Sequence, residues 1–313
     1  MNGMTKRFKT ALATRGHTEA LKDGSVKPRT FDFEFEEVPV IIKAFRRMVR
    51  GQDFDICELA MTTYLCARAY GKPFTAIPVF PMRAFHHGAI LCNTSSGVRT
   101  PKDLEGRRVG VNRGYTVTTG VWARGILQHE HGVDLGKVTW VLSGDEHVAE
   151  YRPPSNAVPI APGATIEALL ASGELAAAIG VRVEAPDVKP LIPNAREAGF
   201  DALRQRGHYP INHTVVVRDD VLDANPDLAA DLFGALAEAK RRYVDRLRSG
   251  RVETPDPVHL RVMEIAGDPL PYGIEANRRM IEAIVTYAVE QRILPRPFAV
   301  EELFHPSTHA LRA

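Results

Sequence analysis

The chain has few cysteines, no excess of one charge and no long apolar run. Its three cysteines, Cys57, Cys66 and Cys92, are odd in number and show no CxxC spacing. They therefore indicate neither a disulfide framework nor a zinc knuckle, and reduced thiols in the cytoplasm fit best. The 40 basic and 38 acidic residues give a formal net charge of +2 without a long basic block, which argues against nucleic acid as a partner.

Membrane and secretion signals are also missing. No window reaches the ~18 apolar residues of a membrane-spanning helix. The N-terminal residues 1–10 are charged, and the apolar segment of about 7–15 residues that a secretory signal needs does not follow them. We therefore expect a cytoplasmic protein with no membrane partner.

What is present is the composition of an ordinary globular protein, with 44% hydrophobic and 25% charged residues. A length of 313 residues favours about two lobes, at roughly 150 residues each. Apolar strands alternate with amphipathic helices, which predicts an α/β fold with a mostly parallel sheet. Strands are expected at 8–13, 31–38, 53–58, 76–80, 89–92, 108–111, 138–142, 176–181 and 214–218, and helices at 40–50, 59–69, 116–131, 166–175, 226–248 and 276–289.

The segment 81–88 is the most informative part of the sequence. It places Arg83, His86 and His87 between the apolar runs 76–80 and 89–92, as if one strand ended at a proline and another began after a bend. Such a bend is typical of the rim of a binding site, where arginine can hold a carboxylate and histidine can move a proton. The expected ligand is a small acid, and the alternative is a turn whose histidines bond only to the backbone.

Six ordered blocks of sequence carry a resemblance to one family over nearly the whole chain. The chain resembles the 4,5-dihydroxyphthalate decarboxylases, relatives of ABC-transporter substrate-binding proteins that share the type II periplasmic-binding-protein-like fold. The second histidine of the first block, His87, matches the family pattern, whereas His86 stands where that pattern more often has arginine. The blocks are 80–87, 101–110, 118–127, 209–213, 268–273 and 294–304.

The resemblance implies a two-lobed fold with a cleft between the lobes, and it implies a discontinuous first lobe. Lobe I is expected to contain residues 1–94 and 213–313, and lobe II is expected to be the insertion 95–212. The polar stretch 94–101 supports the first of these crossings. In open α/β sheets, ligands bind beyond the carboxyl ends of the strands and at the starts of helices.

The implied activity is decarboxylation of an aromatic dicarboxylic acid, most simply 4,5-dihydroxyphthalate to protocatechuate and carbon dioxide, by protonation of a ring carbon in the interlobe cleft. We predict His87 as the ring-carbon acid, with His213 or Glu58 assisting at the hydroxyls. The residues predicted to bind the substrate are Arg83, Arg15, His17, His86, Tyr115 and Thr116.

Several alternatives stay open at this point. Glu58 could cap the helix expected after it. No cofactor is favoured, because the histidines are dispersed without an HExxH spacing, but a divalent metal is left open. The chain could instead be a non-catalytic binding protein for a small aromatic carboxylate, or a lyase acting on a chorismate-like acid, since fold does not settle function. Whether it forms a homo-oligomer is also left open.

Overall fold

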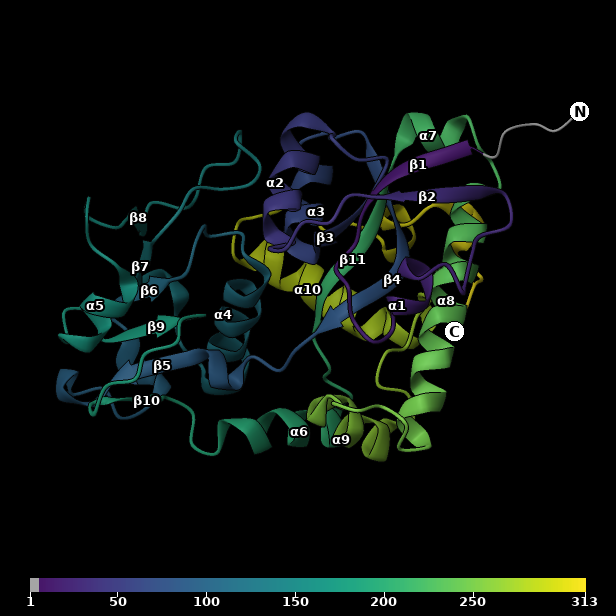
Figure 1. The fold of residues 1–313 in the computed structure, drawn as a ribbon. Helices are drawn as coiled ribbons and strands as arrows, with labels where there is room; N and C mark the ends of the chain where they lie inside the picture. The colour runs from purple at the N-terminus through teal and green to yellow at the C-terminus, as the bar shows by residue number, and fades with distance from the viewer. Residues whose placement is uncertain (1–5) are drawn as a thin grey trace, which may run out of the picture. The chain divides into compact units, whose positions relative to one another are not determined.

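The computed structural model describes residues 6–313. These residues form two compact units (Figure 1). Unit 1 contains residues 6–83, 211–282 and 298–313, and unit 2 contains residues 84–210 and 283–297. Each unit is built around one mixed sheet. The predicted α/β class is confirmed, and five of the nine strand pairings are parallel.

The sheet of unit 1 has the strand order β2-β1-β3-β11-β4. Strand β3 lies in the middle and pairs in parallel with β1 and antiparallel with β11. This order brings residues from the start, the first quarter and the last third of the chain side by side. The strands are β1 (Lys6–Ala11), β2 (Phe31–Phe35), β3 (Ile56–Ala60), β4 (Phe74–Arg83) and β11 (Ile211–Arg218).

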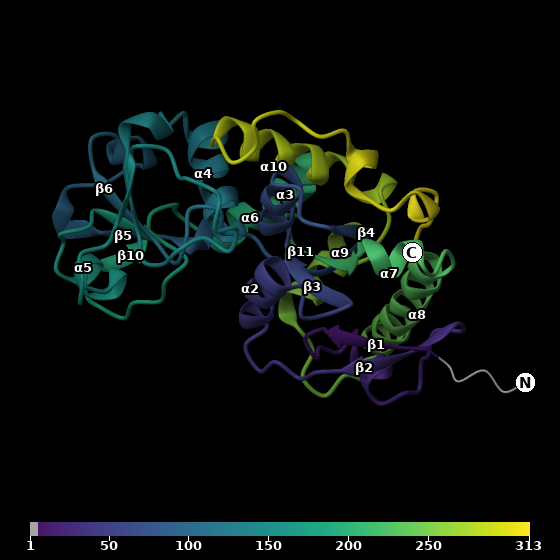
Figure 2. The ribbon, with the colours of Figure 1, turned by 90° about the horizontal axis from the view of Figure 1, so that it is seen from above.

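The helices of unit 1 cover this sheet (Figure 2). The long helix α8 packs on it through a cluster in which Leu232, Leu236 and Tyr243 meet Phe8 and Phe31 of the first two strands. Apolar residues recur along α8 at the helical period, as burial of one face requires. The helices are α1 (Glu19–Lys22), α2 (Ile42–Gly51), α3 (Met61–Ala69), α7 (Asp219–Asp223), α8 (Leu228–Arg248) and α9 (Pro257–Ala266).

The sheet of unit 2 has the order β10-β5-β9-β6-β7-β8. Its strands β9, β6, β7 and β8 run parallel to one another, so their carboxyl ends share one edge. The strands are β5 (Ile90–Asn93), β6 (Arg108–Val111), β7 (Thr139–Leu142), β8 (Ala157–Pro159), β9 (Ala177–Ile179) and β10 (Val188–Pro190), and the helices are α4 (Thr118–His131), α5 (Ile166–Ala171) and α6 (Ala195–Arg206). Helix α10 (Arg278–Glu290) begins in unit 1 and continues into unit 2.

The boundaries of the units differ from the predicted lobes. Residues 84–94 belong to unit 2, because β5 pairs with β9 and β10 in the second sheet. Residues 211 and 212 belong to unit 1, because β11 begins at Ile211. The segment 283–297 returns to unit 2, which composition alone did not indicate. Among residues 6–313, no helix has both the length and the apolar character needed to cross a membrane.

Candidate functional site

Glu58 is a carboxylate in the middle of a fully buried strand. All five residues of β3 are buried, and the side chain of Glu58 has 0% of its surface exposed. An ionised carboxylate in such a place is stable only when paired and hydrogen-bonded. Glu58 lies within the strand rather than after it, two residues before the end of β3, so it does not cap α3 from the position that the sequence suggested.

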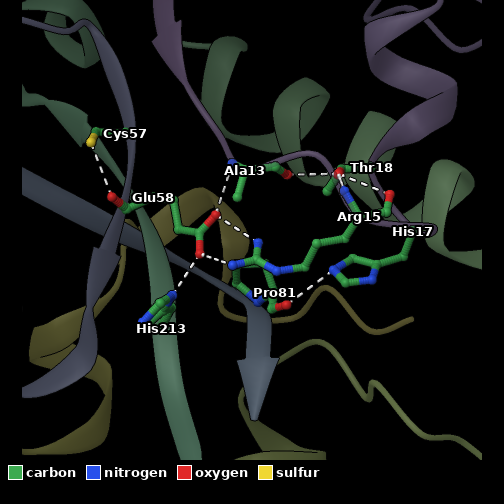
Figure 3. A network of polar contacts seen from close by, with 8 residues as sticks. All are labelled: Ala13, Arg15, His17, Thr18, Cys57, Glu58, Pro81 and His213. Atoms are coloured by element: carbon green, nitrogen blue, oxygen red, sulfur yellow. Dashed lines mark hydrogen bonds and ion pairs between the residues drawn. The ribbon is translucent and has the colours of Figure 1, made fainter. Parts of the chain in front are cut away.

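Three neighbours supply the partners that Glu58 needs (Figure 3). Arg15 approaches with both terminal nitrogens, Nη1 at 2.8 Å from Oε2 and Nη2 at 2.7 Å from Oε1. The backbone N–H of Ala13 donates to Oε2 at 3.1 Å. On the other side, Nδ1 of His213 lies 2.5 Å from Oε1. Ala13 and Arg15 lie in the turn after β1 and His213 lies in β11, and β1 and β11 are the two strands that flank β3.

The network fixes the charge of Glu58. Burial acts to raise the pKa of the carboxyl, but the hydrogen bond from His213 and the charge and hydrogen bonds of Arg15 outweigh it and hold the pKa well below its usual range. Glu58 is therefore an anion at neutral pH. Because a carboxylate only accepts, Nδ1 of His213 carries a hydrogen, which leaves Nε2 as the atom that can exchange a proton.

His213 itself is held in place by packing as well as by Glu58. Its ring meets the ring of Phe45 edge to face, with centroids 5.0 Å apart. About 10% of the side chain stays exposed, and Nε2 forms no hydrogen bond within residues 6–313. A buried carboxylate that orients an imidazole in this way is a common arrangement for general acid–base catalysis.

The turn after β1 is built by Thr18, whose hydroxyl accepts from the backbone N–H of Arg15 at 2.8 Å and donates to the carbonyl of Ala13 at 2.8 Å. This turn holds His17 in a buried position, with 2% of the residue exposed. Nε2 of His17 lies 3.0 Å from the carbonyl oxygen of Pro81, and since a carbonyl only accepts, Nε2 carries the hydrogen. Nδ1 is then a hydrogen-bond acceptor.

Burial, followed by the charge of Arg15, lowers the pKa of His17 to about 3 from its ordinary value of 6.5. His17 is therefore neutral in the folded protein at physiological pH, whereas the unfolded chain takes up a proton below about pH 6.5. The fold thus loses stability from His17 as the pH falls from about 6.5 towards 3. At pH 5 the loss relative to pH 7.5 is roughly 2 kcal/mol, at 1.36 kcal/mol for each pKa unit.

We expect His17→Gln to remove this contribution. Urea unfolding of the wild type and the variant at pH 7.5, 6.5, 5.5 and 5 measures the free energy of unfolding. Over this range the wild type should lose about 2 kcal/mol more than the variant. If the free energy of unfolding changed with pH in the same way for the two proteins, His17 would not be a buried, neutral histidine.

A cavity of about 730 Å³ adjoins Arg15 and His17 within unit 1, which is in the range of roughly 300–1,000 Å³ that small-molecule sites occupy. In its wall the hydroxyl of Tyr243 lies 2.8 Å from Nδ1 of His259. The ring of His17 stands edge-on to both of these rings. The lining residues are Arg15, Gly16, His17, Glu19, Tyr243, Arg246, Arg251, Val252, Glu253, Thr254, Pro255, Asp256, Pro257 and His259.

Arg83 does not lie on a bend, as the sequence suggested, but in β4, which continues through Pro81 to Arg83. The strand tolerates proline because it is the edge strand and its pairing with β11 is irregular there. Arg83 is 8% exposed, and its Nη2 donates to Oδ1 of Asn277 and to the carbonyl of Pro271 at 3.3 Å.

His86 and His87 lie in unit 2 and are 2% and 1% exposed. Nε2 of His87 lies 3.0 Å from Oε2 of Glu130, whose other oxygen accepts from Arg206 at 2.6 Å. Burial acts to raise the pKa of Glu130, but the hydrogen bond and charge of His87 outweigh it and lower the pKa. His87 therefore faces a carboxylate of α4, and Nδ1 is buried without a hydrogen bond within the described chain.

Tyr115 and Thr116 precede α4, as expected. Their backbone N–H groups donate to the carboxylate of Glu146, and the hydroxyl of Thr116 donates to it at 2.5 Å. These donors are thus used within the protein.

The structure therefore gathers Arg15, His17, Glu58 and His213 in unit 1 and places His86, His87, Tyr115 and Thr116 in unit 2. Sequence reasoning missed the residues that complete these contacts. His259 is a lone histidine with no motif, and Glu130 and Glu146 are single carboxylates whose partners lie far away in the sequence. The missed residues are Tyr243, His259, Glu130 and Glu146.

No three His, Cys, Asp or Glu side chains among residues 6–313 gather closely enough to hold a metal ion. The expectation that no metal or other cofactor is needed stays a prediction.

Comparisons with known proteins give two curated relatives, and no family model matches the chain. The chain is 32% identical over 284 residues to a 4,5-dihydroxyphthalate decarboxylase of Comamonas testosteroni, covering 84% of this chain and 86% of that protein. It is 40% identical over 146 residues to a 4,5-dihydroxyphthalate decarboxylase of Pseudomonas putida, covering 44% of this chain and 56% of that protein.

Solved structures show the same fold at low sequence identity. The alkanesulfonate-binding protein SsuA from Xanthomonas axonopodis pv. citri matches with a TM-score of 0.52 and 15% identity, over 96% of this chain and 98% of that chain. The desulfurization enzyme DSZB matches with a TM-score of 0.54 and 13% identity, over 97% of each chain. The similarity to a binding protein and the similarity to an enzyme both show the fold alone. The predicted periplasmic-binding-protein-like architecture is confirmed.

Proposed function

The chain belongs to the 4,5-dihydroxyphthalate decarboxylase family, and on this basis we propose that it is a carboxy-lyase that converts 4,5-dihydroxyphthalate to protocatechuate and carbon dioxide. The observation that carries the proposal is the pair of buried Glu58 and His213, in which Nδ1 of the imidazole is fixed and Nε2 is left for proton transfer. A pair of this kind supplies the acid–base chemistry that the reaction requires.

The reaction needs two proton movements. A hydroxyl para to the departing carboxylate gives up its proton, and the electron density that enters the ring makes the carbon bearing the carboxylate basic. That carbon takes a proton, the electron pair of the carbon–carboxylate bond returns to the ring, and carbon dioxide leaves. The hydroxyl then recovers its proton, so the net change is uptake of one proton and loss of carbon dioxide from the carboxylate.

We assign the hydroxyl proton to Nε2 of His213. The imidazolium formed at this step is stabilised by the anion of Glu58 at 2.5 Å, while Arg15 keeps that anion in place from the other side. Neutral His17 supports the binding of the other hydroxyl, because its Nδ1 is an acceptor.

The proposal is tested by measuring carbon dioxide release from 4,5-dihydroxyphthalate by the purified protein. Phthalate, which lacks the hydroxyls, is the matched control and should release none. In deuterated water the product should carry deuterium at the carbon that lost its carboxylate. Binding of 4,5-dihydroxyphthalate without release would show a solute-binding protein and overturn the proposal.

The role of His87 as the ring-carbon acid stays a prediction. We expect His87→Gln to retain substrate binding, measured by calorimetry, while turnover falls by about 10²-fold or more, because glutamine cannot deliver a proton near neutral pH. Glu130→Gln is the matched variant, since it removes the carboxylate partner and keeps the imidazole. Near-normal turnover of His87→Gln with a lower melting temperature for both variants would make the pair structural.

The role of Arg83 in holding a substrate carboxylate is a separate prediction. Arg83→Lys keeps the charge and loses the planar fork, so binding and turnover should each fall at least about tenfold, or ~1.4 kcal/mol. Arg68→Lys is the control, because Arg68 also donates to a backbone carbonyl of unit 1, but through a hydrogen bond that is exposed to solvent. If the kinetics of Arg83→Lys were unchanged, Arg83 would have only a structural role, through its hydrogen bonds to Asn277 and Pro271.

A further inference from the structure

The loop 112–117 of unit 2 lies at the carboxyl edge of three parallel strands. It follows β6, while Ser143 follows β7 and Gly180 follows β9. The loop is tied to both neighbours, since the side chain of Asn112 donates to the carbonyl of Gly180 at 2.8 Å and the backbone N–H of Arg113 donates to Oγ of Ser143 at 2.7 Å. Ligands of α/β sheets bind at such edges.

Arg113 has a strained backbone within this loop. Its φ of 71° lies in the left-handed region, which costs a residue with a side chain about 1–2 kcal/mol. The conformation is imposed from both sides, because Gly144 donates its N–H to the carbonyl of Arg113 at 3.3 Å. A side chain on Gly144 would come within 3.3 Å of the Cα of Arg113. Strain of this kind is concentrated at functional sites.

The guanidinium of Arg113 has no anionic partner within residues 6–313. Its Nε is buried without a hydrogen bond, and the residue is only partly exposed. Burial alone lowers the pKa of this arginine, with no charged neighbour contributing. A partly desolvated cation without a counter-ion costs free energy that an anionic ligand would recover.

A second arginine adds to the positive charge around the loop. Arg124 is fully buried, and its hydrogen bonds go to neutral atoms, the carbonyl of Tyr115 at 2.6 Å and Oε1 of Gln291 at 2.8 Å. The carboxylate that bonds to the loop is Glu146. A fully buried guanidinium, Arg124, and a partly buried one, Arg113, thus accompany one loop-bound carboxylate. Glu146 acts on the charge of Arg124, whereas no charged group acts on Arg113.

We propose that Arg113 binds the carboxylate of a small aromatic acid at this edge of the sheet of unit 2. The carboxylate supplies the anion that the guanidinium lacks within residues 6–313, and the planar guanidinium can hold it with two hydrogen bonds. The proposal goes beyond the proposed function, because it assigns a binding residue within unit 2 that the acid–base pair of unit 1 does not require.

The experiment measures the binding of phthalate and of protocatechuate by calorimetry. Arg113→Gln should weaken both at least about tenfold, and Arg113→Lys, which keeps the charge without the fork, should weaken them less. Arg108→Gln is the matched control, because Arg108 is an exposed arginine at the opposite end of the same strand; its affinities should stay within about twofold. Unchanged affinity in Arg113→Gln would overturn the proposal.

Arg113→Gly separates a ligand-binding role from a structural one. Glycine adopts a φ of 71° without strain, so the variant should lose binding while its melting temperature does not fall below that of the wild type. A lower melting temperature together with lost binding would show a structural arginine and contradict the proposal. If the wild type binds phthalate through Arg113 but releases no carbon dioxide from 4,5-dihydroxyphthalate, this inference stands and the proposed activity fails.

Discussion

His213→Gln is expected to lower the turnover of 4,5-dihydroxyphthalate by about 10²-fold or more while leaving its affinity within a few-fold of the wild type. Glutamine keeps a donor for Glu58 and much of the packing against Phe45, but it cannot accept and return a proton near neutral pH. Carbon dioxide release gives the turnover, and calorimetry gives the affinity.

His129→Gln is the control for this variant. His129 also lies 2.7 Å from a glutamate, Glu290, but this pair is on the surface, with 39% and 33% of the side chains exposed. Loss of the imidazole there should not change turnover. If His213→Gln turned over normally, His213 would not be the base; if its affinity fell in step with turnover, His213 would bind the substrate rather than move a proton.

Periodicity predicted most of the fold because the elements bury their apolar residues in regular patterns. The elements it missed have physical reasons. No helix was predicted at 195–206, where α6 carries Gly199 in its middle, and the structure shows why a glycine is there: a side chain would come within 2.7 Å of Phe85. Helix α9 was also missed, although Asp256 caps it and Pro257 begins it, a readable start signal.

The bend predicted at Pro81 was wrong because a proline was taken to end the strand. Proline lacks an N–H to donate, but at the edge of a sheet, opposite an irregular pairing, that loss is small. The edge position of β4 follows from the return of β11 between β3 and β4. A sequence without its strand order does not contain this information.

The same limit applies to the site. The sequence singled out Arg15, Glu58 and His213 individually, since Arg15 follows the first predicted strand, Glu58 ends the third, and His213 lies at the second predicted crossing between the lobes. They come together because β3 lies between β1 and β11. The guanidinium of Arg15 bonds Glu58 with both terminal nitrogens, a contact that the sequence did not indicate, and its role in binding the substrate stays a prediction.

Glu58→Gln is expected to be the most destabilising of the single changes considered. Removing one partner of a buried ion pair costs about 3–5 kcal/mol, because the remaining charge loses its compensation. Here Arg15 keeps its charge with 23% of its side chain exposed, and the neutral amide cannot accept from Arg15, Ala13 and His213 as the carboxylate does. Turnover should fall as well, since the imidazolium of His213 loses its anion.

Glu36→Gln is the control variant that shows how much of the effect of Glu58→Gln on stability comes from the burial of Glu58. Glu36 also pairs with two cations, Lys9 and Arg47, but it is 35% exposed, so its loss should destabilise the fold far less than the loss of Glu58. Urea unfolding at pH 7.5 measures the free energy of unfolding of both variants.

The pH dependence of stability adds a second test. A carboxylate with a lowered pKa stabilises the fold above its ordinary pKa of about 4.5 and loses that effect as the pH falls below it. Below pH 4.5 the wild type should therefore lose stability faster than Glu58→Gln. Equal costs for the two substitutions at pH 7.5, with parallel curves in acid, would mean that Glu58 is not held as a buried anion and that it does not orient His213 by charge.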